Sequence, residues 1–161
     1  MVARDGIGSR GEAIFYFRIT DFCGRSQPFF RPRFLGEKAQ TLDYFIELIG
    51  AGQRTPFFFV QVKTTREGYT TRGLPPRLKV GISGRDVRRL ALYPAPTYVV
   101  GIDERQAVGY ILAILGGMTA PIPSLPTNFA LDGTNLRRLW EEVRLFWRGR
   151  DMDMRHSAFS V

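Results

Sequence analysis

Hydrophobic and polar positions follow two different periods along this chain, which predicts a mixture of helices and strands. After a short polar lead, apolar residues at helical spacing predict an amphipathic helix over residues 11–22. A second apolar stripe predicts a long helix over residues 136–147. Between them, Ser83 and Asp86 have the spacing of a capping box, which predicts a short helix ending near residue 92.

Extended segments account for most of the remaining chain. Strands are predicted over residues 28–35, 41–49, 56–65, 77–82, 97–102 and 108–115. The turn residues of 50–55 join the second and third strands as a hairpin, whereas 67–76 and the proline-rich segment around 121–126 are expected to be loops. We therefore expect one α/β (α+β) domain over residues 1–148, followed by a flexible tail over residues 149–161.

Composition narrows the classes of protein that this chain can represent. Its 161 residues suit one domain with a sizeable core. The net charge of +8 favours an anionic partner, either nucleic acid or an acidic membrane. The alternative is that the positive charge reflects the codon usage of the genome, because there are twenty arginines and only three lysines. Without a membrane-length apolar stretch or a signal-peptide core, and with Cys23 as the only cysteine, we expect a cytoplasmic protein that is not inserted in a membrane.

Two absences exclude whole families of chemistry. His156 is the only histidine and lies in the expected tail, so mechanisms that need a histidine base or ligand lack their central residue. The chain has no P-loop motif of the form GxxxxGK[ST], which excludes that class of nucleotidases. The chemistry must therefore come from carboxylates, amides and cationic side chains.

One strongly apolar strand ends in two polar residues. In the run from Phe57 to Lys63, Gln61 and Lys63 are two residues apart and so lie on the same face of the strand. A buried ammonium needs a partner, because leaving it unpaired costs several kcal/mol. If the hairpin turn is centred near residues 52 and 53, Asp43 lies opposite about Val62. A carboxylate, an amide oxygen and an ammonium are thus predicted to meet.

Such a group suits a hard divalent cation and a phosphodiester. Mg²⁺ or Mn²⁺ prefers oxygen ligands, which the Asp43 carboxylate, the Gln61 side chain and the Val62 backbone carbonyl offer. Lys63 would orient a water and help to deprotonate it for attack on phosphorus. Glu12, on the first predicted helix, is the best candidate for a further ligand or base. Glu37, in an expected turn, is a lesser metal candidate, whereas Glu47 is interpreted as a surface or pairing residue.

The pattern Asp43 … Gln61-x-Lys63 behind an acidic N-terminal helix resembles the PD-(D/E)xK phosphodiesterase superfamily in its QxK variant. More closely, the chain resembles a bacterial nuclease-like group, domain of unknown function 4365, over most of residues 10–115. Four segments carry this resemblance: RGEA at 10–13, VQVKT at 60–64, YPAPTYVV at 93–100, and Tyr110. The resemblance implies a restriction-endonuclease-like mixed sheet flanked by helices, catalysis by Asp43, Gln61 and Lys63, and cleavage of DNA, as in bacterial defence against phage or other foreign DNA.

Several arginines are candidate contacts for DNA phosphates, although each can equally be a solvated surface residue. They are Arg66 and Arg72 in the expected loop, and Arg85, Arg88 and Arg89 on the middle helix. Two cuts in a duplex need two sites, so a homodimer or a partner subunit is expected. Two rivals stay open. One is a catalytically inactive nucleic-acid-binding module, since Gln61 removes a negative charge from the metal site; the other is a module that docks on an acidic protein.

Overall fold

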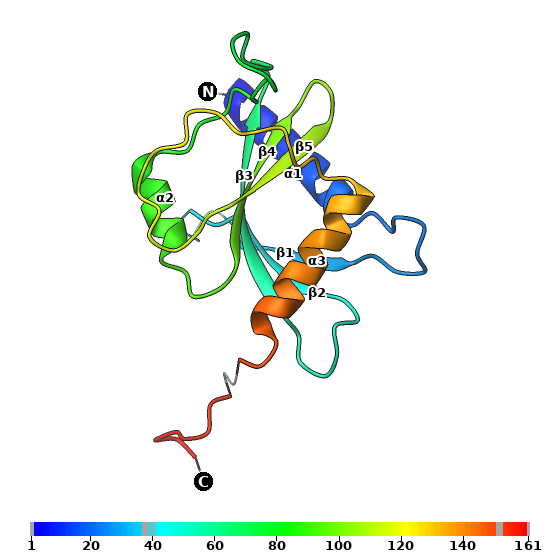
Figure 1. Cartoon of the computed structure of the whole chain (residues 1–161), viewed down its shortest axis with the longest axis vertical. Coiled ribbons are helices and arrows are strands. Elements are labelled where there is room, and N and C mark those ends of the chain that lie inside the picture. The colour runs from blue at the N-terminus through cyan, green and yellow to red at the C-terminus, as the bar shows by residue number, and fades with distance from the viewer. Residues whose placement is uncertain (1, 37–38, 40, 151–152, 161) are drawn as a thin grey trace.

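A five-stranded mixed sheet forms the centre of the molecule (Figure 1). The computed structural model describes residues 2–36, 39, 41–150 and 153–160. Along the sheet the strands are β1 (Phe30–Phe34), β2 (Tyr44–Leu48), β3 (Phe57–Thr65), β4 (Thr97–Asp103) and β5 (Val108–Ala113). β3 and β4 are parallel, and the other neighbouring pairs are antiparallel. A parallel pair needs a crossover connection, and the segment between β3 and β4 supplies it.

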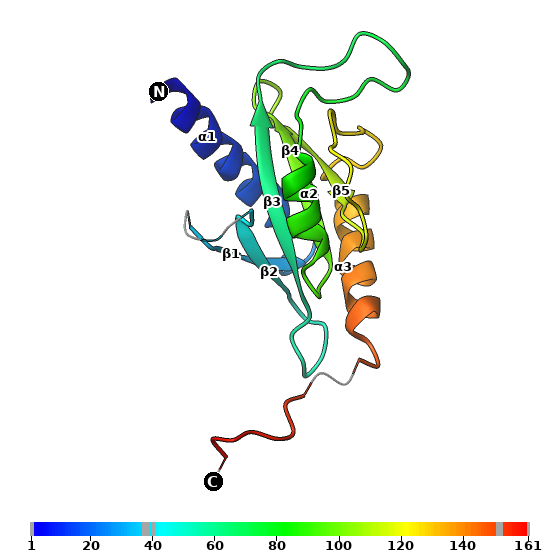
Figure 2. The same ribbon diagram turned by 90° about the vertical axis from the view of Figure 1, so that its left-hand side faces the viewer.

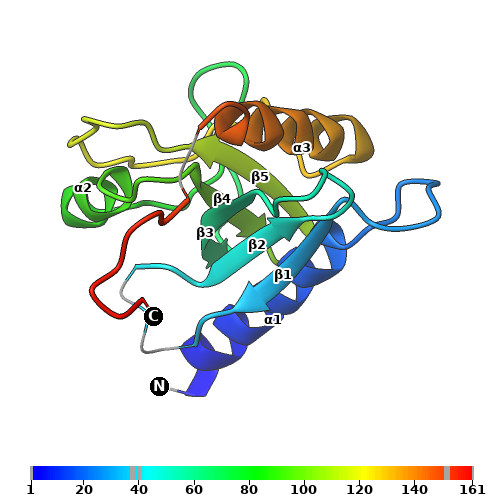
Figure 3. The ribbon, with the colours of Figure 1, turned by 90° about the horizontal axis from the view of Figure 1, so that it is seen from below.

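Within the described residues the chain forms three helices, α1 (Val2–Ile19), α2 (Gly84–Ala91) and α3 (Gly133–Trp147). β3 lies between α1 and α2 (Figure 2), and α1 runs beside β1 when the molecule is seen from below (Figure 3). The Ser83 hydroxyl accepts a hydrogen bond from the Asp86 amide at 3.1 Å, so the predicted cap of α2 is confirmed. The expected mixed α+β class is confirmed as well.

The two faces of the sheet have separate apolar cores. On one face, α1 and α3 pack together against alternate residues of β2, β3 and β4, among them the fully buried Phe58 and Val60. On the other face, Val87 and Leu90 of α2 pack against Val99 of β4. Successive side chains of a strand point to opposite faces. The residues of β3 are therefore divided between two different environments.

The first helix differs from the prediction at both ends. It begins at Val2, within the expected polar lead, and ends at Ile19 instead of residue 22. Gly6 and Gly8 lower the intrinsic helix propensity of this lead, but packing against a sheet outweighs propensity. At the other end, Cys23 and Gly24 have φ of 52° and 75°, and this left-handed turn directs the chain towards β1.

Two predicted strands also differ from the structure. The strand predicted over 41–49 begins only at Tyr44, because Thr41 has φ of 69°, which no strand residue adopts. Residues 77–82 form isolated bridges, through Leu78 and Ile82, instead of a strand. Leu78 pairs with Tyr69 and Leu125, and Ile82 with Ile122. Two of these partners lie in the proline-rich segment, where the missing amide donors prevent a continuous ladder.

None of the helices in the described ranges combines the length and the apolar character needed to cross a membrane. Beyond α3, residues 153–160 run away from the sheet without a helix or strand (Figure 1). Asp153 of this segment forms an ion pair with Arg54 in the loop between β2 and β3, with an N–O distance of 2.6 Å.

Candidate active site

Asp43 lies immediately before β2, where pairing with β3 ends. Tyr44 pairs with Val60, and the Asp43 amide also donates to the Val60 carbonyl oxygen, at 3.0 Å. Two successive residues therefore face one residue of β3, which is the arrangement of a β-bulge, a device that changes the direction of a side chain. The Asp43 carboxylate reaches along β3, and its Oδ2 accepts a hydrogen bond from the Val62 amide at 2.6 Å.

The predicted register of the hairpin was wrong by one residue. The pairing of Tyr44 with Val60 centres the turn on Gly52, so Asp43 is not directly opposite Val62. The carboxylate nevertheless meets the backbone between Gln61 and Lys63, because its side chain spans the difference. The structure therefore brings the Asp43 side chain to the strand between Gln61 and Lys63. It does so through a side-chain hydrogen bond and not through direct strand pairing.

Gln61 is buried, with 5% of its surface exposed, and its Oε1 has no hydrogen-bond partner among the residues that the structure describes. Leaving a buried acceptor unsatisfied costs about 1–3 kcal/mol, and buried polar groups are normally bonded. A buried carbonyl oxygen without a partner is suited to a cation or a water molecule. Because the Asp43 carboxylate is bonded to the amide of Val62, the residue after Gln61, the two residues offer oxygen donors at adjoining positions of β3.

Lys63 is half-buried and forms no ion pair with any described residue. Its charge nevertheless acts on the carboxylate nearby. Burial raises the pKa of Asp43 above its ordinary value, and the Val62 amide and the Lys63 ammonium oppose that rise. The carboxylate is therefore only partly compensated by the protein, and an additional positive charge would be favourable there.

Glu12 lies near the end of β3, where α1 crosses closely over the strand on the sheet face opposite to α2. A Cβ added at Gly11 would lie 1.7 Å from Oγ1 of Thr64, so the helix contacts the strand at the level of its backbone. Glu12 follows directly and lines a cavity of about 420 Å³ together with Val62 and Lys63. Burial, then the charges of Glu12 and Asp43, raise the pKa of Tyr44 to about 12. The charges of the Glu12 and Asp43 carboxylates thus both raise the pKa of the Tyr44 phenol.

The other acidic candidates do not join this site. Glu47 forms an ion pair with Arg33 on the adjacent strand, which confirms it as a pairing residue. Glu37 lies outside the described residues. In the described part of the chain, no three histidine, cysteine, aspartate or glutamate side chains form a group able to hold a metal. A cation at this site would depend on mixed oxygen donors: Asp43, Gln61, the Val62 carbonyl and Glu12.

Arg66 has a structural partner that the sequence did not indicate. Its Nε lies 2.6 Å from Glu104, and Nε of Arg10 lies 2.6 Å from the other carboxylate oxygen. The hydrogen bond from Arg66 is the main cause that lowers the pKa of Glu104. Glu104 is buried, although it lies in the turn between β4 and β5. Its arginine partners come from α1 and from the end of β3, so only the tertiary fold identifies it.

The other candidate DNA-binding arginines remain at the surface. Arg72 is exposed in the loop after β3, and the exposed face of α2 carries Arg85, Arg88 and Arg89. Arg85 also lies 3.7 Å from the carboxylate of Asp86. α2 covers the face of the sheet to which Phe59 and, by alternation, Gln61 and Lys63 belong. These arginines therefore lie on the same side of the sheet as the candidate site.

Comparison with known proteins gives no match: no family model fits the chain, and no curated protein or solved structure is significantly similar to it.

Proposed function

We propose that this protein is a metal-dependent phosphodiesterase that cleaves DNA, built on a restriction-endonuclease-like fold with the QxK form of the PD-(D/E)xK site. One observation carries the proposal: the Asp43 carboxylate is hydrogen-bonded at Val62, between the buried amide of Gln61 and the ammonium of Lys63. The mixed sheet with helices on both faces supports the fold assignment.

The residues present fit a hard divalent cation such as Mg²⁺ or Mn²⁺. The unsatisfied Oε1 of Gln61 and the incompletely compensated Asp43 carboxylate are the donors that such an ion prefers. Val62 would add its backbone carbonyl, and Glu12 a second carboxylate. When bound, the ion supplies positive charge for the phosphorus oxygens and acidifies a water molecule.

Lys63 and Glu12 supply the remaining chemistry from the protein itself. Without an ion pair among the described residues, the Lys63 ammonium has donors available for a phosphate oxygen or for the attacking water. Glu12 lines the same cavity and is the residue placed to accept the proton of that water. The hydrogen bond from the Val62 amide fixes the orientation of the Asp43 carboxylate, which would be one of the oxygen ligands of the ion.

DNA is the proposed substrate because of the charge on the molecule and its distribution. The net charge is +8, and four exposed arginines lie on the loop after β3 and on α2. Arginines there would contact phosphates without reading sequence. A single site cuts one strand, so cleavage of a duplex would need a homodimer or a partner subunit. Defence of a bacterium against foreign DNA is the proposed setting.

Plasmid cleavage tests the proposal. Purified protein is incubated with supercoiled plasmid and Mg²⁺ or Mn²⁺, and the same reaction is run in EDTA. We expect metal-dependent nicking that Asp43→Asn and Lys63→Met each reduce by about 10²- to 10³-fold, the size of losing one electrostatic contact to the transition state. Glu47→Gln and Lys79→Met are matched controls, because they make the same charge changes elsewhere, and they should cleave like the wild type.

Other outcomes select the rival functions. Equal cleavage by all variants would identify a contaminating nuclease and overturn the proposal. DNA binding without metal-dependent cleavage would leave a non-catalytic binding module. DNA binding no tighter than that of an unrelated basic protein would favour a module that docks on an acidic protein. An RNA of equal length, tested in parallel, would show which nucleic acid is the substrate.

A further inference from the structure

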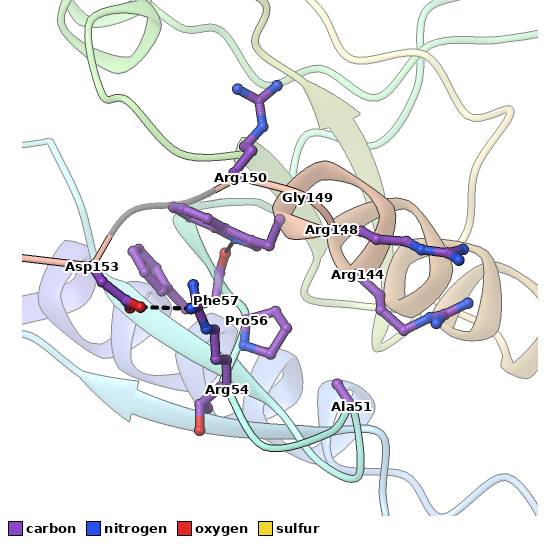
Figure 4. Close-up of a pocket in the computed structure, with 11 residues that line it drawn as sticks. Ala51, Arg54, Pro56, Phe57, Arg144, Arg148, Gly149, Arg150 and Asp153 are labelled. Carbon is purple, nitrogen blue, oxygen red and sulfur yellow. Dashed lines mark hydrogen bonds and ion pairs between the residues drawn. The ribbon is translucent and has the colours of Figure 1, made fainter.

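A second cleft lies at the start of β3, towards the other end of the strand from the candidate active site. It lies between the loop that joins β2 to β3 and the C-terminal end of α3 (Figure 4). Its volume is about 630 Å³, within the range of ordinary ligand sites. Four arginines and one aspartate line it: Arg54, Arg144, Arg148, Arg150 and Asp153. The cleft is therefore strongly basic.

Two of these arginines, Arg144 and Arg148, form no ion pair with any described residue. The side chains of Arg144 and Arg148 project in the same direction (Figure 4). The Nε of Arg144 is buried and has no hydrogen-bond partner among the described residues, and Arg148 is exposed and forms no ion pair within that set. A buried donor without a partner is costly, and an anion would satisfy it. Arg54 is already paired with Asp153, at 2.6 Å.

The end of α3 does not repel an anion as a bare helix C-terminus would. The last carbonyl groups of a helix carry partial negative charge. Here the Phe146 carbonyl accepts a hydrogen bond from Nε of Arg150 at 2.5 Å, and the Trp147 carbonyl accepts one from the Arg150 amide at 3.2 Å. The Arg144 carbonyl accepts the Arg148 amide at 3.1 Å. The arginine side chains therefore dominate the local field.

The floor of the cleft is aromatic and fixed in position. The rings of Phe57 and Trp147 have centroids 4.8 Å apart, and both residues are half-buried. The indole N–H of Trp147 donates to the Phe57 carbonyl at 2.8 Å, which fixes the orientation of the ring. A cationic groove over an aromatic platform is the combination by which proteins hold single-stranded nucleic acid, because any unpaired base can stack on the ring.

Only Phe57 of the cleft shares a face of β3 with the candidate active site, because α3 packs on the opposite face of the sheet. Phe57, Phe59, Gln61 and Lys63 alternate onto that face, and the Phe57 and Phe59 rings lie 5.7 Å apart. With a rise of roughly 3.3 Å per residue, Gln61 and Lys63 are about 13–20 Å from Phe57. The cleft and the candidate active site are thus separate sites near opposite ends of β3.

We infer that this cleft binds single-stranded nucleic acid, with phosphates against Arg144 and Arg148 and an unpaired base on the Trp147 ring. The inference goes beyond the proposed function, because such binding needs neither a metal ion nor Asp43. It defines the class of ligand as nucleic acid with an unpaired segment, since bases within a duplex have no free face for stacking.

Fluorescence anisotropy tests this inference with a labelled single-stranded oligonucleotide in EDTA. We expect the double variant Arg144→Gln/Arg148→Gln to bind at least tenfold more weakly than the wild type. Its plot of log affinity against log salt should be shallower by about 0.7 for each lost phosphate contact. Arg137→Gln/Arg138→Gln is the matched control, because it removes the same charge from another part of α3. It should stay within about twofold of the wild type.

A second variant separates stacking from charge. Trp147→Leu should weaken binding of the oligonucleotide and leave the salt dependence unchanged, because the aromatic platform carries no charge. Circular dichroism checks that this variant is folded, and the arginine variants decide the question if it is not. A duplex of the same length should compete poorly with the single strand.

Three results would overturn the inference. Equal weakening by the two arginine pairs would show attraction by net charge alone. Displacement of the oligonucleotide by a polyglutamate peptide at equal charge concentration would point to an acidic protein partner. A duplex that competes as well as the single strand would remove the role of the aromatic platform. Plasmid cleavage stays a separate readout: its absence, with cleft binding intact, would contradict only the nuclease proposal.

Discussion

The two faces of β3 differ in what surrounds them, although they alternate along the same nine residues. Phe58 and Val60 point into the core shared by α1 and α3, and neither has any exposed surface. On the opposite face, Phe57, Phe59 and Lys63 are only half-buried. The same face carries Gln61, whose Oε1 has no hydrogen-bond partner among the described residues.

This contrast separates stability from chemistry within one strand. The covered face contributes apolar burial, the main favourable term in folding. The other face is covered by α2 and by the bridged segments around Leu78 and Leu125, which bury Gln61 but leave Lys63 half-exposed. The bulge at Asp43 then directs a carboxylate towards that strand from the neighbouring chain segment. Variants on the two faces should therefore affect different properties.

The largest effect on stability should come from the covered face. Phe58→Ala removes a ring that packs against Phe30 and Tyr98 in the closed core, and we expect it to lower the free energy of unfolding by about 3–5 kcal/mol. Phe59→Ala should cost clearly less, because Phe59 is half-buried. Urea denaturation of both variants measures the difference. Equal losses would mean that the two faces do not differ in burial energy.

A smaller effect should come from the crossing of α1 over β3. Alanine normally stabilises a helix relative to glycine, but a Cβ at Gly11 would collide with Thr64. We expect Gly11→Ala to lower the free energy of unfolding by about 1–3 kcal/mol, the usual cost of overpacking, and to reduce plasmid cleavage by displacing Glu12.

Gly6→Ala is the control for that change. Its added Cβ has nothing within 4 Å, so it should stabilise the protein by up to about 1 kcal/mol and leave cleavage unchanged. Thermal unfolding of the two variants gives the comparison. If Gly11→Ala is as stable as Gly6→Ala, the helix is not in backbone contact with the strand, and the placement of Glu12 at the site fails.

The smallest effect should be a dependence on pH that originates at Asp43. Its pKa is raised in the folded protein, mainly by burial, so folding favours the protonated acid. This contribution is complete below the unfolded pKa of about 3.9 and is lost as the pH rises through the folded pKa. In EDTA, Asp43→Asn should therefore gain stability relative to the wild type between about pH 4 and 7. We expect less than about 1 kcal/mol, because solvent reaches the carboxylate.

The same experiment with Mg²⁺ sharpens the comparison. A cation at Asp43 would favour the ionised carboxylate, so the advantage of Asp43→Asn at neutral pH should shrink or reverse when the metal is added. Glu47→Gln serves as the control, because its carboxylate is paired with Arg33. An advantage of Asp43→Asn that is the same with and without metal would mean that no cation binds there.

Local patterns made the elements of the sheet and the candidate site predictable. Strand alternation and the hairpin loop lie close together in sequence, so Asp43, Gln61 and Lys63 could be grouped before the fold was known. The exact register of the hairpin could not be predicted, because a shift of one residue in the turn changes it. The early start of α1 was missed because packing on the sheet outweighs the glycines in that segment.

Contacts between distant segments were beyond the reach of the sequence. The burial of Glu104 depends on Arg10 and Arg66, which come from separate elements. Likewise, the second cleft forms only where the end of α3 docks on the loop before β3. The sequence shows several arginines near the end of α3, but that feature alone does not place them beside Trp147 and Phe57.

The most direct test of the central claim is anomalous diffraction from crystals soaked in Mn²⁺. We predict one ion that is coordinated by a carboxylate oxygen of Asp43 and by Oε1 of Gln61, within about 2.5 Å of each, with the Lys63 ammonium beside it. An ion found only elsewhere, or a Gln61 amide oxygen that bonds to a protein donor while the Asp43 carboxylate stays without a ligand, would contradict the account.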